Sequence, residues 1–405
     1  MSQLVKRGDS PQDRFAAEVL DLFRSDGRVE DAWYDRDQFA ISVRPVDGTP
    51  VWARLTDLYE QWGLADSASR SAPLAQLVQQ TLAPPELPDS WEAARELVRP
   101  VLRGLTAALP PSREPESGAL WRRSMPYLAE LVELDLPGGP ALPIAHVEQW
   151  GISAEDVFAT ARHNLAARVL QPELSGQAAD RVLRLVDDGG LYCVSQLLID
   201  GWLAGFSWHL GGRPVAFLPD RSTLLVAPDN PAVLTSVFEM VEEEYDRATR
   251  PVSPMAYTVD GTGRLVPYAA PHGHPLYVPA GRAERVLAAA EYGKQKRWLE
   301  DAGSPHRAGT VMLSGRSDGS VFSVATMSRD GATLLPRTDY VAMYVDAAET
   351  VFVAWDDAQQ ILGLKPEQFL EPERYLVDPW LAGGSRGALH EAAVDPCAGN
   401  PYAVA

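Results

Sequence analysis

The chain has 405 residues, of which 36 are lysine or arginine and 55 are aspartate or glutamate, so its formal net charge is −19. This excess of acids argues against nucleic acid and anionic membranes as partners, because both require clustered basic side chains that neutralise phosphate. The balance of 46% hydrophobic to 22% charged residues is that of a globular protein and argues against extended disorder.

The chain lacks the features of an exported or membrane protein. Residues 1–11 carry charges and no apolar run, and no stretch of about 18 apolar residues, the length that spans a bilayer, occurs. The two cysteines, Cys193 and Cys397, are too few for a disulfide framework or a thiolate zinc site and fit a reducing compartment. We therefore expect a cytoplasmic protein.

Residues 1–110 are predicted to form an N-terminal α+β domain. Its first helix begins at Pro11, because the Ser10 side chain can cap it and Asp13 completes the spacing of a capping box. A turn at Asp47-Gly48 then predicts a β-hairpin. The later elements expected in this domain are strands 38–43 and 51–55 and helices 55–62, 73–82 and 90–105.

Residues 118–303 are predicted to form a central α+β domain, after a linker rich in proline and polar residues at 110–118. Ser153 and Asn230 are expected to cap helices, since their side chains can accept hydrogen bonds from the first helical turn. The expected elements are strands 129–134 and 141–145, a helix from 153, strands 215–218 and 223–227, a helix 230–245, a hairpin 255–268 and a helix 282–299.

Residues 304–380 are predicted to form a third domain, an antiparallel β meander. Short β runs at 311–313, 321–326, 340–345 and 351–354 are separated by clusters of Gly, Asp and Ser, which favour turns. Residues 381–405 show no periodicity and predict a flexible tail. The predicted fold class is α+β, with mixed helices, short antiparallel sheets and this C-terminal meander.

His272 and His274 have the most metal-like spacing in the chain, because two imidazoles two residues apart can share one cation. A third ligand is missing nearby, since the local acids end at Asp260 and resume at Glu284. We interpret the two histidines as loop residues and predict no metal and no other cofactor.

Asp220 and Arg221 lie at a predicted turn between strands 215–218 and 223–227. The guanidinium of Arg221 could bind a carboxylate or phosphate of a ligand, because its planar set of donors matches both groups. Asp220 and Arg221 could equally pair with each other. Both residues are kept as candidate ligand-binding residues, together with His272 and His274.

Candidate nucleophiles lack the surroundings that activate them. The pattern G-x-S-x-G occurs around Ser317 and around Ser385, but a nucleophile elbow needs a strand before it and a helix after it. Ser317 is predicted to lie in a hairpin turn and Ser385 in the tail. Cys193 has apolar neighbours and no basic residue beside it, which favours an inert core thiol.

One segment carries a family resemblance. The run Trp150–Phe158, continued by Ala161 and Asn164-Leu165, resembles the segment shared by the YtpQ-like family of uncharacterised bacterial proteins. Flanking features agree with this family at 53–59, 129–145, 195–198 and 215–226, so the resemblance covers residues 12–290.

The chain also departs from the family pattern. The family typically has a Pro-Ser-Arg-Asp-like turn where this chain has Pro219-Asp220-Arg221-Ser222, so no role for a final Asp carries over. The region after residue 305 is an addition to the pattern. The resemblance implies no reaction, cofactor or catalytic residue.

Two functional hypotheses follow. The first is a non-catalytic protein that binds another protein, one of basic charge, as an immunity-like or regulatory partner. The chain is acidic, and although most of its 11 tryptophans should pack in the core, a surplus of tryptophan is also typical of a partner-binding surface. The second is an enzyme whose site is assembled from distant loops around Arg221, His272 and His274. A pocket in which several titratable groups converge would favour the enzyme.

Overall fold

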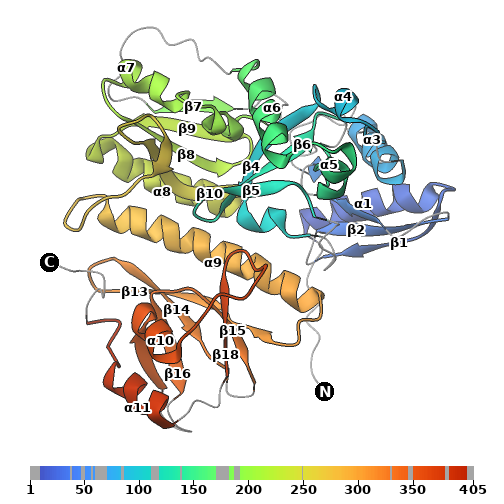
Figure 1. Ribbon diagram of the computed structural model, residues 1–405. Coiled ribbons are helices and arrows are strands. Elements are labelled where there is room, and N and C mark those ends of the chain that lie inside the picture. The colour runs from blue at the N-terminus through green and yellow to red at the C-terminus, as the bar shows by residue number, and fades with distance from the viewer. Residues whose placement is uncertain are drawn as a thin grey trace. The chain divides into compact units, whose positions relative to one another are not determined.

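A computed structural model gives the fold and confirms the α+β class (Figure 1). It describes residues 10–36, 39–46, 51–55, 58–59, 71–83, 86–110, 118–136, 139–169, 182–186, 192–248, 250–328, 331–344, 350–378 and 383–398. The predicted turn at Asp47-Gly48, most of the predicted linker (111–117) and the end of the predicted helix 55–62 lie outside these residues. The chain divides into two compact units, residues 1–94 with 135–140 and residues 95–134 with 141–405.

The first unit is a three-stranded antiparallel sheet with helices on one face. Helix α1 begins where the sequence predicts, since the Ser10 hydroxyl accepts a hydrogen bond from the Asp13 N–H and the Asp13 carboxylate accepts one from the Ser10 N–H. Phe15 and Phe23 on α1 are buried against Ile41 of the sheet. The elements are α1 (Pro11–Ser25), β1 (Val29–Asp35), β2 (Ala40–Pro45), β3 (Val51–Arg54), α3 (Ser71–Leu82) and α4 (Trp91–Ala94), with strand order β1-β2-β3.

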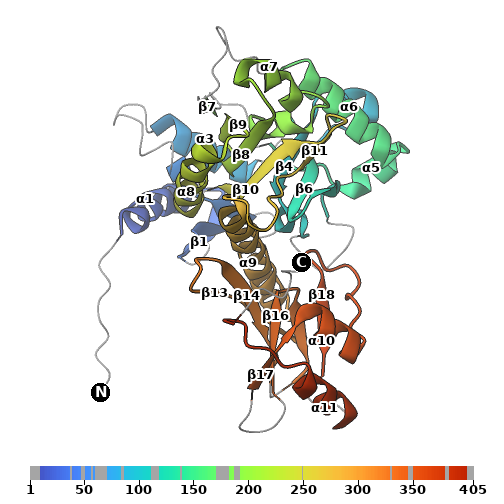
Figure 2. The ribbon, with the colours of Figure 1, turned by 90° about the vertical axis from the view of Figure 1, so that its left-hand side faces the viewer.

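The second unit contains a five-stranded antiparallel sheet of order β11-β10-β8-β9-β7. Helices α8 and α9 pack against it from one side, and the segment with η3, η4 and α7 packs from the other (Figure 2). Its elements are β7 (Leu183–Val186), η3 (Val194–Leu198), η4 (Leu203–Phe206), α7 (Ser207–Leu210), β8 (Pro214–Asp220), β9 (Thr223–Pro228), α8 (Pro231–Arg247), β10 (Pro251–Val259), β11 (Leu265–Pro267) and α9 (Tyr277–Asp301).

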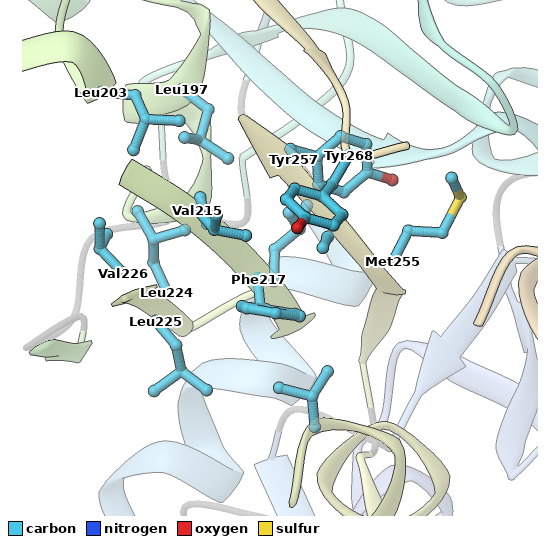
Figure 3. Close-up of a cluster of buried hydrophobic side chains, with 14 of the residues drawn as sticks. Leu197, Leu203, Val215, Phe217, Leu224, Leu225, Val226, Met255, Tyr257 and Tyr268 are labelled. Atoms are coloured by element: carbon cyan, nitrogen blue, oxygen red, sulfur yellow. The ribbon is translucent and has the colours of Figure 1, made fainter. Parts of the chain in front are cut away.

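The core of the second unit lies on this sheet. Phe217 of β8 meets Phe238 of α8 edge to face, with ring centroids 5.1 Å apart. Tyr257 of β10 is fully buried, and its hydroxyl hydrogen-bonds with that of Ser253 at 2.8 Å. Figure 3 shows Phe217 and Tyr257 among the leucine and valine side chains of the same cluster. The strands and the helix predicted over residues 215–268 are present, and the Asn230 side chain caps α8 by accepting from the Ala232 N–H.

A smaller antiparallel sheet of order β4-β6-β5 comes before the five-stranded sheet in the chain. One prediction for this region was wrong. The helix predicted over 90–105 ends at Ala94, and Val98–Gly104 is strand β4. Pro100 explains the error, because its ring cannot continue a helix but is tolerated in a strand at the edge of a sheet. The remaining elements of this region are η1 (Leu105–Ala108), β5 (Trp121–Met125), β6 (Leu128–Leu134), α5 (Ile144–Trp150) and α6 (Ala154–Ala166).

The strand predicted at 141–145 is reduced to isolated bridges, Glu133 with Ala141 and Ala119 with Pro143, because α5 begins at Ile144. The helix predicted from Ser153 is present as α6. The Ser153 hydroxyl accepts the Asp156 N–H at 3.1 Å and so caps its first turn.

The C-terminal strands form two sheets, of orders β12-β15-β18 and β13-β14-β16-β17. Two pairings depart from a simple antiparallel meander. Strand β12 pairs with β15 in parallel, and β14 pairs with β16 in parallel, because β15, the strand between them, joins the other sheet. The elements are β12 (Arg307–Ala308), β13 (Val311–Gly315), β14 (Val321–Thr326), β15 (Thr333–Pro336), β16 (Tyr340–Tyr344), β17 (Thr350–Ala354), α10 (Trp355–Leu362), β18 (Arg374–Val377) and α11 (Gly383–Glu391).

Helix α11 lies within the segment predicted as a flexible tail. Its Leu389 is fully buried in the same cluster as Trp355 of α10, so this side chain helps to anchor the helix. The residues 381, 382 and 399–405 of the predicted tail lie outside the described residues.

Helix α9 joins the five-stranded sheet to the C-terminal strands (Figure 2). Its Glu291 is buried and accepts hydrogen bonds from the N–H and the hydroxyl of Thr106, at 2.7 and 2.8 Å. One turn further on, Gln295 accepts a hydrogen bond from the guanidinium of Arg374 in β18 at 2.6 Å.

Arg374 is fully buried. Besides Gln295, its guanidinium donates to the carbonyl oxygens of Tyr292, Gly309 and Leu334, each within 2.9 Å. Burial lowers the pKa of Arg374 to about 10. These four acceptors lie on α9, on β15 and just after β12, so one side chain holds the three segments together.

Candidate functional site

Asp220 and Arg221 lie at the turn between β8 and β9, as predicted. One carboxylate oxygen of Asp220 accepts hydrogen bonds from the N–H and the hydroxyl of Ser222, at 2.8 and 2.7 Å. The other oxygen accepts from the N–H of Arg250 at 3.2 Å, and the N–H of Arg221 donates to the carbonyl of Arg250. Because both oxygens of Asp220 hold backbone or turn groups, this residue stabilises the turn and the chain that enters β10.

His272 and His274 lie in the turn that precedes α9. Nδ1 of His274 accepts a hydrogen bond from the N–H of Leu276 at 3.2 Å, and the His274 carbonyl accepts from the N–H of Tyr277. The exposed ring of His272 lies edge-on to the ring of Tyr277, with centroids 5.2 Å apart. Within the described ranges, no three His, Cys, Asp or Glu side chains gather in a group that could hold a metal ion.

These four residues occupy two turns, and the contacts of Asp220, His272 and His274 described above stay within or beside their own turn. The structure therefore explains three of them through the local backbone and ring packing. The enzyme hypothesis around Arg221, His272 and His274 stays a prediction.

The three candidate nucleophiles lie in the core, in a hairpin turn and in a helix. Cys193 is fully buried, and its thiol lies 3.6 Å from the Leu185 carbonyl oxygen. Ser317 lies in the turn between β13 and β14, where the Asp318 carboxylate accepts hydrogen bonds from the N–H and hydroxyl of Ser320. Ser385 lies inside α11. The predicted hairpin turn at Ser317 and core position of Cys193 are confirmed.

A group of ionisable side chains surrounds the middle of α9. The Arg285 guanidinium donates to both carboxylate oxygens of Asp339, at 2.7 and 2.8 Å, and Asp339 also accepts from the N–H and hydroxyl of Ser323. Burial opposes ionisation of Asp339, but these donors outweigh it and hold its pKa below the usual value. Burial also raises the pKa of Glu284, with a smaller contribution from Asp339. Since every oxygen of Asp339 is engaged, this group ties α9 to β14 and β16.

The most unusual surface of the first unit is the face of its sheet opposite the helices, which we call the outer face. Trp33 of β1 lies directly opposite Ser42 of β2, and Ser42 lies opposite Trp52 of β3. The two indole rings meet over Ser42 at an interplanar angle of 78°, with centroids 6.4 Å apart. Trp33 and Trp52 remain 40% and 48% exposed, whereas Ser42 is 1% exposed.

The alternation of side chains along the strands places these residues. Successive side chains of a strand point to opposite faces, so Trp33 lies outward between Ala32 and Tyr34, which face α1. In the same way Trp52 lies outward next to Ala53, which is buried. Helices α1 and α3 cover only the inner face, which leaves the two tryptophans on the outer face.

Charged side chains border the tryptophan pair. Glu30 and Asp31 are exposed on β1 beside Trp33, and Arg44 is exposed on β2 two residues from Ser42. An aromatic centre with a polar rim is the arrangement found at the energetic centre of protein interfaces. The sequence did not single out Trp33 and Trp52, although the alternation of side chains around both is readable there.

Comparison with known proteins gives no further identification, since no family model, no curated protein and no solved structure matches the chain. The resemblance to the YtpQ-like family therefore stays a prediction. Among the helices that the structure describes, none is long and apolar enough to cross a membrane.

Proposed function

We propose that this chain is a cytoplasmic, non-catalytic protein that binds another protein, as an immunity-like or regulatory partner, through the outer face of β1, β2 and β3. The observation that carries the proposal is the pair Trp33 and Trp52, which stands half exposed at the centre of a sheet face. Tryptophan is enriched at interface hot spots because it offers a large apolar area with few rotatable bonds.

The exposed aromatic area would contribute to the free energy of binding. A tryptophan side chain offers roughly 200 Å² of surface, so at half exposure each ring leaves about 100 Å² in contact with water. At about 25 cal/mol per Å², covering both rings contributes on the order of 5 kcal/mol. Two neighbouring rings that already pack edge to face also lose little side-chain entropy when a partner covers them.

The charge of the protein favours a basic partner. The formal net charge is −19, and Glu30 and Asp31 stand exposed beside Trp33. Opposite charges around an interface accelerate association and are screened over a Debye length of about 10 Å at 0.1 M salt. We therefore expect complex formation to slow as salt rises, while the tryptophan contacts persist.

Affinity purification of the tagged full chain from its native cells, with quantitative mass spectrometry, tests the proposal. The double variant Trp33→Ala/Trp52→Ala should lose a stoichiometric basic protein that the wild type retains. The matched control is Trp208→Ala, since Trp208 of α7 is 62% exposed but lies in the second unit. With the purified partner, we expect the double variant to raise Kd at least 30-fold, the effect of losing about 2 kcal/mol.

Thermal melts of all three proteins show whether the variants remain folded. Equal recovery of the partner by the wild type and the double variant would contradict the proposed surface. The absence of any stoichiometric protein partner would contradict the proposed function.

A further inference from the structure

A pocket of about 840 Å³ lies in the second unit, between the end of α9, strand β12 and the end of β14. Pockets that hold small molecules usually measure roughly 300–1,000 Å³. The pocket is therefore large enough for an organic molecule and much larger than a single inorganic ion requires.

The charge of the pocket is opposite to that of the chain. Lys296, His306 and Arg307 line it, against the single acid Glu300. The Lys296 ammonium lies 3.8 Å from the Glu300 carboxylate, a loose and exposed pair. In the part of the chain that the structure describes, the imidazole of His306 and the guanidinium of Arg307 make no hydrogen bond or ion pair. Their donors are thus available in a protein where acids outnumber bases by 19.

A hydroxyl group supplements these donors. The Lys296 ammonium donates to the Thr310 hydroxyl oxygen at 2.8 Å. A hydroxyl that accepts such a bond still has its own hydrogen to donate, so Thr310 can pass a hydrogen bond from Lys296 to an anion in the pocket. Met312 and Met327 add an apolar portion to the lining.

The wall of the pocket is fixed before any ligand arrives. The buried Arg374 guanidinium holds the carbonyls of Gly309 and Leu334, both at 2.8 Å. The hydroxyl oxygen of the buried Thr333 accepts the N–H of Ser328 at 2.9 Å. A wall whose polar groups are already paired costs little to organise on binding.

We propose that this pocket binds an organic phosphate of about mononucleotide size. Lys296, His306 and Arg307 would hold the phosphate oxygens, and Met312 and Met327 would contact the organic portion. Three cationic or imidazole groups with Thr310 offer more donors than the two oxygens of one carboxylate can use, whereas a phosphate or diphosphate has enough oxygens to engage them. This proposal is independent of the outer face in the first unit.

Isothermal titration calorimetry of the full chain with ADP, pyrophosphate and adenosine, at low salt, tests it. We expect saturable binding of ADP, weaker binding of pyrophosphate and none of adenosine. Arg307→Glu and Lys296→Ala should each weaken ADP binding at least tenfold. The matched control is Arg247→Glu, because Arg247 is an exposed arginine of α8 that pairs with Glu243 away from this pocket.

Circular dichroism and thermal melts identify any variant that fails to fold, and Thr310→Val then serves as a conservative replacement that removes only the hydroxyl donor. No saturable binding of ADP at millimolar concentration would overturn the proposal. An equal loss in Arg247→Glu would also overturn it by showing diffuse electrostatic attraction. Tighter binding of pyrophosphate than of ADP would overturn the assignment of an organic portion.

Discussion

Two sheets of this protein bury their side chains to different extents. In the five-stranded sheet every residue of β8 and β9 except Asp220 is buried, because elements cover both of its faces. In the three-stranded sheet of the first unit, Ala32 is the single buried residue of β1, and Trp33 beside it is exposed. The five-stranded sheet is buried on both faces in the core of the second unit. The three-stranded sheet buries one face and leaves its outer face exposed.

This difference shows what an aromatic residue does in each setting. Phe217 of β8 is enclosed by the core, where its removal leaves a cavity. Trp52 of β3 lies over Ser42 and in contact with water, so its removal leaves mostly solvent. Large apolar side chains of similar size should therefore differ sharply in their effect on stability and on binding.

The largest effect on stability is expected at the five-stranded sheet, which is covered on both faces. Phe217→Ala should lower the free energy of unfolding by about 3–5 kcal/mol, because it removes a fully buried ring that packs edge to face on Phe238. Denaturant unfolding followed by circular dichroism measures this change. A loss below about 1 kcal/mol would show that Phe217 does not lie in the core of its unit.

The contact between β4 and α9 in the second unit is closely packed. An added Cβ at Gly104 would lie 2.5 Å from a carboxylate oxygen of Glu291, so Gly104→Ala should destabilise by about 2 kcal/mol as Glu291 leaves Thr106. Gly293→Ala in α9 is the control, since an added Cβ meets no atom within 4 Å there. That variant should gain up to about 1 kcal/mol in the same unfolding measurement. Equal effects of the two substitutions would refute the close packing at Gly104.

Alkaline pH should lower the free energy of unfolding by a smaller amount, through Tyr257 of the five-stranded sheet. Burial raises the pKa of Tyr257, with a smaller opposing effect of its hydrogen bond to Ser253. Below pH 10 the side chain is protonated in both folded and unfolded chains, and its contribution to stability is fully present. Above pH 10 the unfolded chain loses this proton while the folded chain keeps it, so stability falls as pH rises.

Unfolding measured between pH 9 and 11.5 checks this expectation. The slope of stability against pH should be shallower in Tyr257→Phe than in the wild type, by at most about 1.4 kcal/mol per pH unit once the unfolded tyrosine ionises. Identical slopes would refute a raised pKa for Tyr257, because the contributions of separate tyrosines to this slope add.

The smallest effect on stability is expected at the outer face. Trp52→Ala should change the free energy of unfolding by less than about 1 kcal/mol, because half of the ring already contacts water and the neighbouring Trp33 can relax over Ser42. The same variant should have a large effect on partner binding. A loss of 3 kcal/mol on unfolding would instead identify the tryptophan pair as a structural cluster.

Local capping signals in the sequence were sufficient to place several helices. Ser10, Ser153 and Asn230 each cap the helix predicted for them, because a cap depends on residues within one turn. Strand pairing depends on distant residues, which explains why the parallel contact of β14 with β16 was not predicted. The helix predicted over 90–105 was wrong because the ring of Pro100 cannot continue a helix.

The candidate surface was less predictable than the fold. Trp33 and Trp52 are separated by 19 positions in the chain and become neighbours only through the register of β1, β2 and β3. Alternating apolar residues around each tryptophan could have placed both on one sheet face. The packing of α1 and α3 decides which face of the sheet is covered, and no local sequence pattern predicts that packing.

Arg374 has a consequence for how this gene can be rearranged. The residue belongs to the C-terminal strands, yet two of its four acceptors, Tyr292 and Gln295, lie on α9. A recombination event that joined residues 304–378 to another protein without α9 would carry along a buried guanidinium with half of its acceptors missing, at a cost of several kcal/mol. Viable exchanges must keep α9 and the C-terminal strands together, so we expect them to be inherited as one segment.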